Sequence, residues 1–243
     1  MEQHVELLKI KAFQLIANYR KPMSFNFWDT YPLPTLSTIR GWFHNVINAD
    51  RYIPLSTSIQ GSFSSVIYDL QTLIKFDRPE RAKSKGYPYL KNFNKSLSKS
   101  PTYVANIFHN ELLIYIYSDK KYLKKFAENV LTNSYPSIGR YEDIARIDKI
   151  EFIKPQKVNF YDEEHIITYG IYLKKETATK LNLHGINYRM NFKYNQSLLE
   201  KTGLRYFEKK DVVYVDNGII EENELLFDTE ENRIIDLIGD DEL

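Results

Sequence analysis

The sequence of 243 residues predicts an α+β fold, and three observations support this prediction. Some segments alternate apolar and polar residues with the period of a strand, and two others repeat apolar residues with the period of a helix. These segments follow one another in the order strand, helix, strand, strand, helix, strand. With 43% hydrophobic residues, a chain of this length buries roughly 70% of its unfolded surface on folding.

The first strand and the first helix are predicted from the spacing of their apolar residues. Residues 7–16 alternate apolar and polar side chains, which is typical of a strand. Pro32 and Pro34 then break the chain, and Ser37 is placed to cap a helix. The apolar positions of this helix are Ile39, Trp42, Phe43, Val46 and Ile47, which fall at i, i+3, i+4, i+7 and i+8.

The remaining elements complete a βαββαβ order. Strands are expected over residues 64–76 and 111–117, and Ser118 or Asp119 is placed to cap a second helix. Its apolar face is formed by Leu123, Phe126, Val130 and Leu131. A last strand is expected over 144–153. The order is that of the ferredoxin-like (RRM-like) arrangement, which we assign to residues 1–155 and which many RNA-binding domains share. A fold by itself does not establish a function.

Beyond residue 155 the sequence is rich in strand-forming residues. Strands are expected at 165–173, 186–193 and 205–216, with no helix of comparable clarity. We therefore expect a β-rich C-terminal subdomain over residues 156–217, or an extension of the first sheet. Residues 218–243 form an acidic tail.

The charge of the chain is unevenly distributed. Its net charge is +1, yet residues 221–243 hold ten acids against Arg233 alone, so the preceding part is basic. A basic body with an acidic tail is expected of a protein that binds a polyanion. The tail carries apolar residues suited to docking on a partner or on the body, and the alternative is a solvated, partly disordered end.

Composition argues against several classes of site. The chain has no cysteine, and its five histidines are scattered without metal-ligand spacing, so we expect no disulfide, metal or cofactor. No leader segment and no run of about 20 apolar residues is present, so we expect a cytoplasmic protein that is not bound to a membrane.

A long basic excursion connects the second and third predicted strands. It covers about residues 77–108, far more than the usual ~4–6 residues of a connection. Its stretch from 78 to 99 holds seven basic residues against Glu80, with aromatic residues among them. Cations that neutralise phosphates and rings that stack on bases are what single-stranded nucleic acid requires; the alternative is a solvated mobile loop. The residues expected to bind are Lys83, Lys85, Tyr87, Lys91 and Lys95.

A second candidate site is the glycine-centred loop YPSIGRYEDIARID at 135–148. The chain has only nine glycines, so Gly139 marks backbone in an unusual conformation or in close approach to something, and Arg140 offers a planar fork for phosphate. Ser137, Gly139 and Arg140 are therefore expected to contact an anion. Alternatively, Gly139 caps the preceding helix while Arg140 pairs with Glu142 or Asp143.

Further contacts are expected near the first helix. Arg20 and Lys21 stand beside a proline turn after the first strand, and Arg40 lies in the first turn of the helix. A cation there is unfavourable to the helix dipole unless an anion or acid answers it, and a bound phosphate would do so. His44 and His109 are the candidates for metal-independent acid–base cleavage of RNA, although neither lies in a recognisable motif and a structural role is the alternative.

Several segments together resemble the CRISPR-associated RAMP proteins of Cas family five, in particular the Tneap-type subunit of type I-B Cascade. They are YRKPMSFNFWDTYPLPTLSTIRGWFHNVI (19–47), STSIQGSFSSVIYDLQTLIKF (56–76), YPSIGRYEDIARIDKIEFI (135–153) and, more weakly, LHGINYRMNFKYN with GLRYFEKKDVVYVD (183–216). The resemblance covers nearly the whole chain and depends on the order and spacing of these segments.

This resemblance implies a non-catalytic, RNA-binding subunit that caps the 5′ handle of crRNA in a ribonucleoprotein complex for antiviral defence. The excursion 77–108 would be its thumb, Ser137 to Arg140 its glycine-rich loop, and Arg20 with Lys21 its basic turn. The Cascade backbone subunit and large subunit would be its partners. Some type I-C relatives process crRNA with a Tyr, Lys and His constellation, which this sequence does not display at recognisable spacing. The alternatives are a metal-independent endoribonuclease that processes CRISPR repeat RNA, and a module whose basic loop binds an acidic protein.

Overall fold

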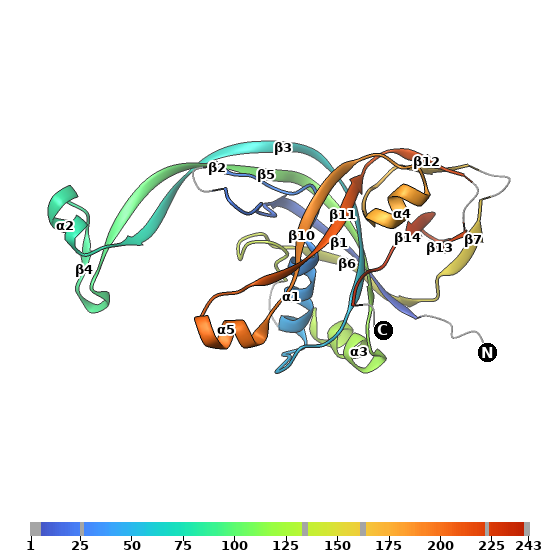
Figure 1. Ribbon diagram of the computed structural model, residues 1–243, viewed down its shortest axis with the longest axis horizontal. Coiled ribbons are helices and arrows are strands. Elements are labelled where there is room, and N and C mark those ends of the chain that lie inside the picture. Colours follow the sequence, from blue (N-terminus) through green and yellow to red (C-terminus); the bar gives the residue numbers. More distant parts are fainter. Residues whose placement is uncertain (1–5, 25–26, 133–135, 161–163, 222–223, 241–243) are drawn as a thin grey trace.

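The structure, a computed structural model, describes residues 6–24, 27–132, 136–160, 164–221 and 224–240. Within these ranges, one sheet of ten mostly antiparallel strands forms the centre of the fold (Figure 1). Its main path has the order β10-β11-β9-β3-β5-β1-β6. These strands are β1 (Leu7–Ala17), β3 (Ser56–Asp77), β5 (Lys95–Tyr117), β6 (Arg146–Ile153), β9 (Gly170–Lys174), β10 (Ile186–Tyr194) and β11 (Phe207–Val215). The short strands β2 (Phe27–Trp28), β4 (Tyr89–Leu90) and β15 (Ile238–Gly239) pair with β5 or β3.

Two helices pack on one face of this sheet. Helix α1 (Leu36–Val46) connects the β1–β2 segment to β3, and α3 (Lys120–Asn129) connects β5 to β6. Their apolar sides meet where the Phe126 ring stacks on Phe43 at 5.3 Å and meets Trp42 edge-on at 4.9 Å. These rings share the main hydrophobic core with Leu8, Ile10 and Ile114 of the sheet, among others. Burial of such side chains stabilises the fold by about 1.5–3 kcal/mol each.

The ends of both helices differ from the sequence prediction. Thr35, and not Ser37, is the N-cap of α1, because its side-chain oxygen accepts a hydrogen bond from the backbone N–H of Thr38 at 3.2 Å. Helix α3 ends at Asn129, with Val130 as its C-cap. Leu131, expected on the apolar face of this helix, lies beyond its end and is 68% exposed.

Strands β3 and β5 form a hairpin much longer than predicted. They pair from Ser56 opposite Tyr117 to Asp77 opposite Ser96, and the outer half projects from the body as an arm (Figure 1). Most of the excursion expected after residue 77 is therefore strand. Between the two strands, the tip contains α2 (Glu80–Lys85), β4 and the short 3₁₀ helix η1 (Lys91–Phe93). Both faces of an isolated ribbon meet solvent, so the outer half of β5 is rich in serine and lysine and lacks the clean alternation of a half-buried strand.

The C-terminal part extends the first sheet and adds two small ones. Strand β9 pairs with β3 at Gln60 opposite Ile171, and β11 and β10 follow outward. The small sheets are β12 (Gly218–Ile220) with β8 (His165–Ile167), and β14 (Arg233–Ile235), β13 (Glu224–Asp228) and β7 (Gln156–Asn159). Two short helices that the sequence did not reveal, α4 (Lys175–Lys180) and α5 (Gln196–Thr202), lie between the strands.

Ion pairs hold the acidic tail on the body. Lys9 of β1 is only 1% exposed, and its Nζ atom lies 2.6 Å from Glu151, 3.1 Å from Asp228 and 2.8 Å from Glu230. Burial disfavours the ammonium, but hydrogen bonds from it to these three carboxylates outweigh the burial, and the pKa of Lys9 rises well above its usual value. Residues 224–240 thus dock on the body and do not form a solvated end. None of the helices in the described ranges is long and apolar enough to cross a membrane.

Candidate nucleic-acid interface

The turn that follows β1 presents Arg20. The chain is anchored just before it by Tyr19, which is buried and hydrogen-bonded through its hydroxyl to Gln14 at 2.5 Å and Asn110 at 2.7 Å. The Arg20 guanidinium lies over the Trp28 ring at 4.1 Å and donates to the Ser24 carbonyl at 2.7 Å. Arg20 is therefore presented by a fixed turn and oriented by an aromatic ring.

The glycine loop lies beside this turn and closes on itself. The backbone N–H of Ala145 donates to Pro136 at 2.8 Å, and that of Ile138 donates to Asp143 at 3.1 Å. Gln14 of β1 donates to the carbonyls of Ile138 and Asp143 at 2.9 and 2.8 Å. Ser137 bridges to Ile144 at the base of the loop. These bonds fix the loop against the end of β1.

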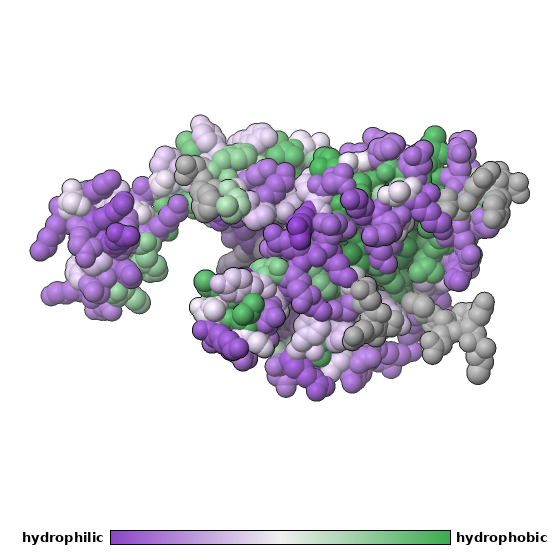
Figure 2. Space-filling view, viewed as in Figure 1, coloured by the Kyte–Doolittle hydropathy of each residue, from purple (hydrophilic) through white to green (hydrophobic). Residues whose placement is uncertain are grey.

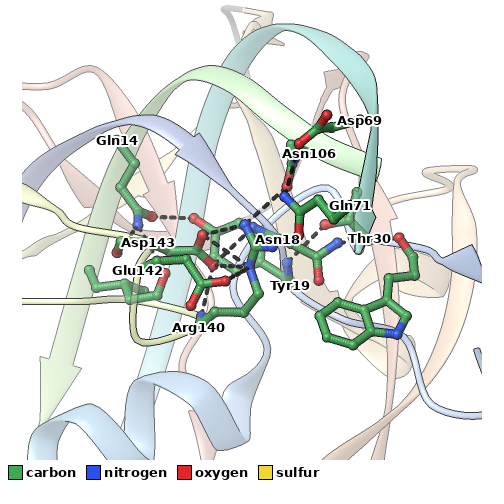
Figure 3. Close-up of polar contacts among 12 residues, drawn as sticks. Gln14, Asn18, Tyr19, Thr30, Asp69, Gln71, Asn106, Arg140, Glu142 and Asp143 are labelled. Atoms are coloured by element: carbon green, nitrogen blue, oxygen red, sulfur yellow. Dashed lines mark hydrogen bonds and ion pairs between the residues drawn. The ribbon is translucent and has the colours of Figure 1, made fainter. Parts of the chain in front are cut away.

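One carboxylate joins the loop to the turn (Figure 3). Asp143 is 1% exposed, and its Oδ2 atom accepts from the backbone N–H of Asn18 at 3.0 Å and of Arg140 at 2.7 Å. The Arg140 guanidinium donates to Oδ1 through Nη2 at 2.7 Å, and to Asn106 at 3.0 Å. Asp143 thus links segments 125 residues apart in the sequence.

Gly139 is required by this arrangement. Its φ is +118°, a conformation that side-chain-bearing residues rarely adopt, and an added Cβ would lie 2.7 Å from the Asp143 carboxylate. Gly139 does not cap the preceding helix, because α3 ends at Asn129. The alternative interpretation of Arg140, that it pairs with acids of the loop, is correct: it pairs with Asp143, and with Glu142 at 3.3 Å. The position in which we expected an external anion is therefore held by a carboxylate of the chain itself.

The turn, the loop and α1 together line a cavity of about 410 Å³. The turn contributes Arg20 and Lys21, and the loop contributes Gly139 and Arg140. The other walls include Thr35, Ser37 and Thr38 at the start of α1, and Asn191 of β10. Free N–H groups and the dipole make a helix start favourable to anions. Four of the residues predicted from the sequence thus line a single cavity.

The cations of this cavity differ in whether an acid neutralises them. Lys21 pairs with Asp29 at 2.8 Å and Arg140 pairs with Asp143. Arg20 has no carboxylate within ion-pair distance in the described part of the chain. Partial desolvation without a compensating acid lowers the pKa of Arg20 from its usual value, although an arginine remains protonated. Arg20 therefore carries the uncompensated charge of the cavity.

Arg40 lies outside this cavity, and its charge is already balanced by an acid. Its side chain is buried, and both terminal nitrogens lie 3.2 Å from the Asp240 carboxylate, while Nη2 also donates to the Leu55 carbonyl. Tyr52 donates to the same carboxylate. Burial opposes the charge of Asp240, but the hydrogen bonds from Tyr52 and the Leu55 backbone and the charge of Arg40 lower its pKa. The acid that neutralises Arg40 comes from the tail, so no phosphate is needed to balance this charge.

The cations of the hairpin tip stand apart from the cavity. Lys83, Lys85, Lys91 and Lys95 are exposed, and within the described residues no carboxylate pairs with them. Tyr87 is half-buried beside them. The tip forms a largely hydrophilic lobe at the end of the arm (Figure 2). The fold therefore places the basic excursion on a projecting support and separates it from Arg20.

The two candidate histidines have different surroundings. The Nδ1 atom of His44 lies 2.8 Å from the Arg40 carbonyl, and its Nε2 accepts from the backbone N–H of Ile53 at 2.9 Å. Both ring nitrogens of His44 are therefore engaged, and burial lowers its pKa. His109 is exposed on β5 at a φ of +54°, with its ring 4.8 Å from that of Phe13.

Sequence reasoning did not identify Asp143 as the link between the loop and the turn, and it missed Asn191 in the lining of the cavity. The role of Asp143 in joining the loop to the turn depends on its hydrogen bond from Asn18, which is distant in the sequence. From the sequence, only the spacing of Arg140 and Asp143 indicated a local ion pair. Asn191 belongs to a strand of the C-terminal part and gave no sequence signal.

Comparisons with known proteins rest on structure alone. No family model matches the sequence, and no curated protein matches it. A chain of a CRISPR RNA-guided surveillance complex gives a TM-score of 0.57 at 11% identity, over 88% of this chain and 90% of that one. A CRISPR protein from Archaeoglobus fulgidus gives 0.47 at 10% identity, over 96% and 98%. The second likeness is too distant to carry an argument. The first shows that this chain shares its fold with a chain of a CRISPR RNA-guided surveillance complex.

Proposed function

We propose that this protein is a crRNA-binding structural subunit of a type I CRISPR surveillance complex, a RAMP protein of Cas family five with the Tneap-type, type I-B pattern. It would cap the 5′ handle of crRNA, contact the backbone and large subunits of Cascade in the cytoplasm, and serve antiviral defence. The strand order β6-β1-β5-β3, with α1 and α3 on one face, supports a ferredoxin-like βαββαβ domain.

The observation that carries this proposal is the cavity beside the end of β1. It combines the uncompensated Arg20, the hydroxyl-bearing residues Thr35, Ser37 and Thr38 at the start of α1, and the close-packed glycine loop. A guanidinium that lacks a carboxylate partner and lies over an aromatic ring is suited to bind a phosphate of a single strand while a neighbouring base stacks. The unpaired lysines of the hairpin tip offer further phosphate contacts.

Binding measurements with Arg20→Ala test the proposal. Fluorescence anisotropy with labelled repeat-derived RNA, recorded over a range of salt concentrations, should show steep salt dependence for the natural protein. The logarithmic slope should be roughly −0.7 for each phosphate neutralised. Arg20→Ala should weaken binding by about tenfold and reduce that slope by about 0.7. Arg51→Ala, which removes an exposed arginine that contacts only Tyr122 among the described residues, is the matched control.

Two results would contradict this function. A flat salt dependence of binding would argue for a ligand other than RNA. Site-specific cleavage of repeat RNA in EDTA, abolished by His44→Ala or His109→Ala, would instead favour the endoribonuclease. The engaged ring nitrogens of His44 support the non-catalytic role proposed here over the endoribonuclease.

A further inference from the structure

A second projecting arm lies on the same side of the molecule as the hairpin tip. It consists of the end of β10, helix α5 and the start of β11, residues 193–210, and no sequence motif marks it as a binding site. Its charged residues are five cations and two acids: Lys193, Lys201, Arg205, Lys209 and Lys210 against Glu200 and Glu208. We infer that this arm is a second binding surface for single-stranded RNA, which holds the strand after it leaves the cavity at Arg20. The inference rests on the proposed function and extends it to residues of the C-terminal part.

The arm is held in one conformation by local hydrogen bonds. The Asn195 side chain caps α5 by accepting from the backbone N–H of Leu198 at 3.0 Å. Gly203 ends the helix in the left-handed region, at a φ of +70°, and its N–H donates to the Leu199 carbonyl at 2.8 Å. The N–H of Asn195 donates to the carbonyl of Tyr206 at 2.9 Å and closes the base. The residues that follow the helix are therefore presented by an ordered support.

The side chains presented there combine charge with aromatic surface. The Arg205 guanidinium lies 5.5 Å from the centre of the Tyr194 ring, and Tyr206 next to it is 48% exposed. In the described part of the chain, Lys201, Arg205 and Lys209 have no carboxylate within ion-pair distance, whereas Lys193 pairs with Glu208 and Asp240. Arginine next to exposed rings, flanked by unpaired lysines, is the combination that stacks bases and neutralises phosphates on a single strand.

Strand β10 connects this surface to the cavity. Asn191 lines the cavity, and the chain continues through Lys193 and Tyr194 into α5. Figure 1 shows α5 and the hairpin tip extending to the same side of the body, and Figure 2 shows open solvent between the two lobes. Both lobes carry unpaired cations, so an RNA strand in the cavity would meet positive charge on either side as it leaves. Charge complementarity therefore selects a polyanion as the occupant of the α5 arm.

The length of the RNA provides the test. We expect a trinucleotide to be held at the cavity alone, and a strand of about 16 nucleotides also to reach surfaces beyond it. Anisotropy should be measured for both RNAs with a variant that combines Lys201→Ala, Arg205→Ala and Lys209→Ala. The matched control combines Lys154→Ala, Lys175→Ala and Lys180→Ala, which removes the same charge from exposed lysines outside this arm.

We expect the arm variant to bind the longer RNA at least about tenfold more weakly, with a logarithmic salt slope reduced by about 2. Its trinucleotide affinity should match that of the natural protein, and the control should bind both RNAs normally. An unchanged affinity for the longer RNA, or an equal loss in the control, would overturn the inference while the proposed function stands. If the natural protein binds neither RNA, the proposed function fails as well.

Discussion

Replacing Asp143 with alanine should destabilise the protein far more than a typical loss of an ion pair. The substitution leaves the buried backbone N–H groups of Asn18 and Arg140 without an acceptor and removes the acid that balances the Arg140 guanidinium. Loss of one partner of a buried pair costs about 3–5 kcal/mol. Because the Arg140 side chain keeps 14% exposure and some hydration, we expect the lower end, about 3 kcal/mol.

Urea denaturation and thermal melting measure this effect. A loss of about 3 kcal/mol corresponds to a fall in melting temperature of about 6–12 °C for a chain of this size. Asp148→Ala is the matched control, since it also breaks an Asp–Arg pair, with Arg146 at 2.5 Å, but on the surface, where we expect less than about 1 kcal/mol. Equal losses in the two variants would refute the view that Asp143 holds the turn and the loop together.

Two further predictions concern the loop and the acidic tail. Gly139→Ala should lower the free energy of unfolding by about 1–3 kcal/mol, because of its positive φ and because an added Cβ would lie 2.7 Å from the Asp143 carboxylate. Gly86→Ala is the control, since Gly86 also has a positive φ but open space around it, and we expect a loss of about 1 kcal/mol. A larger loss for Gly86→Ala than for Gly139→Ala in urea unfolding would contradict the close approach at Gly139. Hydrogen bonds from Lys149 and Lys9 lower the pKa of Glu230 from 4.5 to about 2, so its stabilisation should be complete above pH 4.5 and be lost as the pH falls toward 2. The urea midpoint of Glu230→Gln should therefore fall less steeply over that range, and parallel curves would count against the ion pairs of Glu230.

The elements that bury one face were predictable from the sequence, because burial imposes a period on the apolar residues. This holds for β1, β6 and the two long helices, and in the C-terminal part for β8 to β11, whereas β7 and β12 to β15 were not predicted. The length of the β3–β5 hairpin was not predicted. The outer part of β3 was expected as a strand at 64–76, but residues 56–63 and 95–110 were not, and the outer half of β5 lacks a regular alternation of apolar and polar residues. Helices α4 and α5 are too short to establish a period. The predicted boundaries at residues 155 and 217 remain predictions.

The residues of the candidate site were predictable from their chemical types and from their positions beside turns and near a helix start. Four of these residues line one cavity. The sequence by itself determined that Arg20 and Arg140 flank turns, that Arg40 lies near the start of a helix, and that the tail is acidic. Only the tertiary structure decided which of these charges is left for a ligand. Asp240, 200 residues from Arg40, neutralises it, and Asp143 neutralises Arg140, while no acid of the described chain reaches Arg20. The physical reason is that a charge is balanced by its neighbours in space, and these come from segments that the chain brings together only on folding.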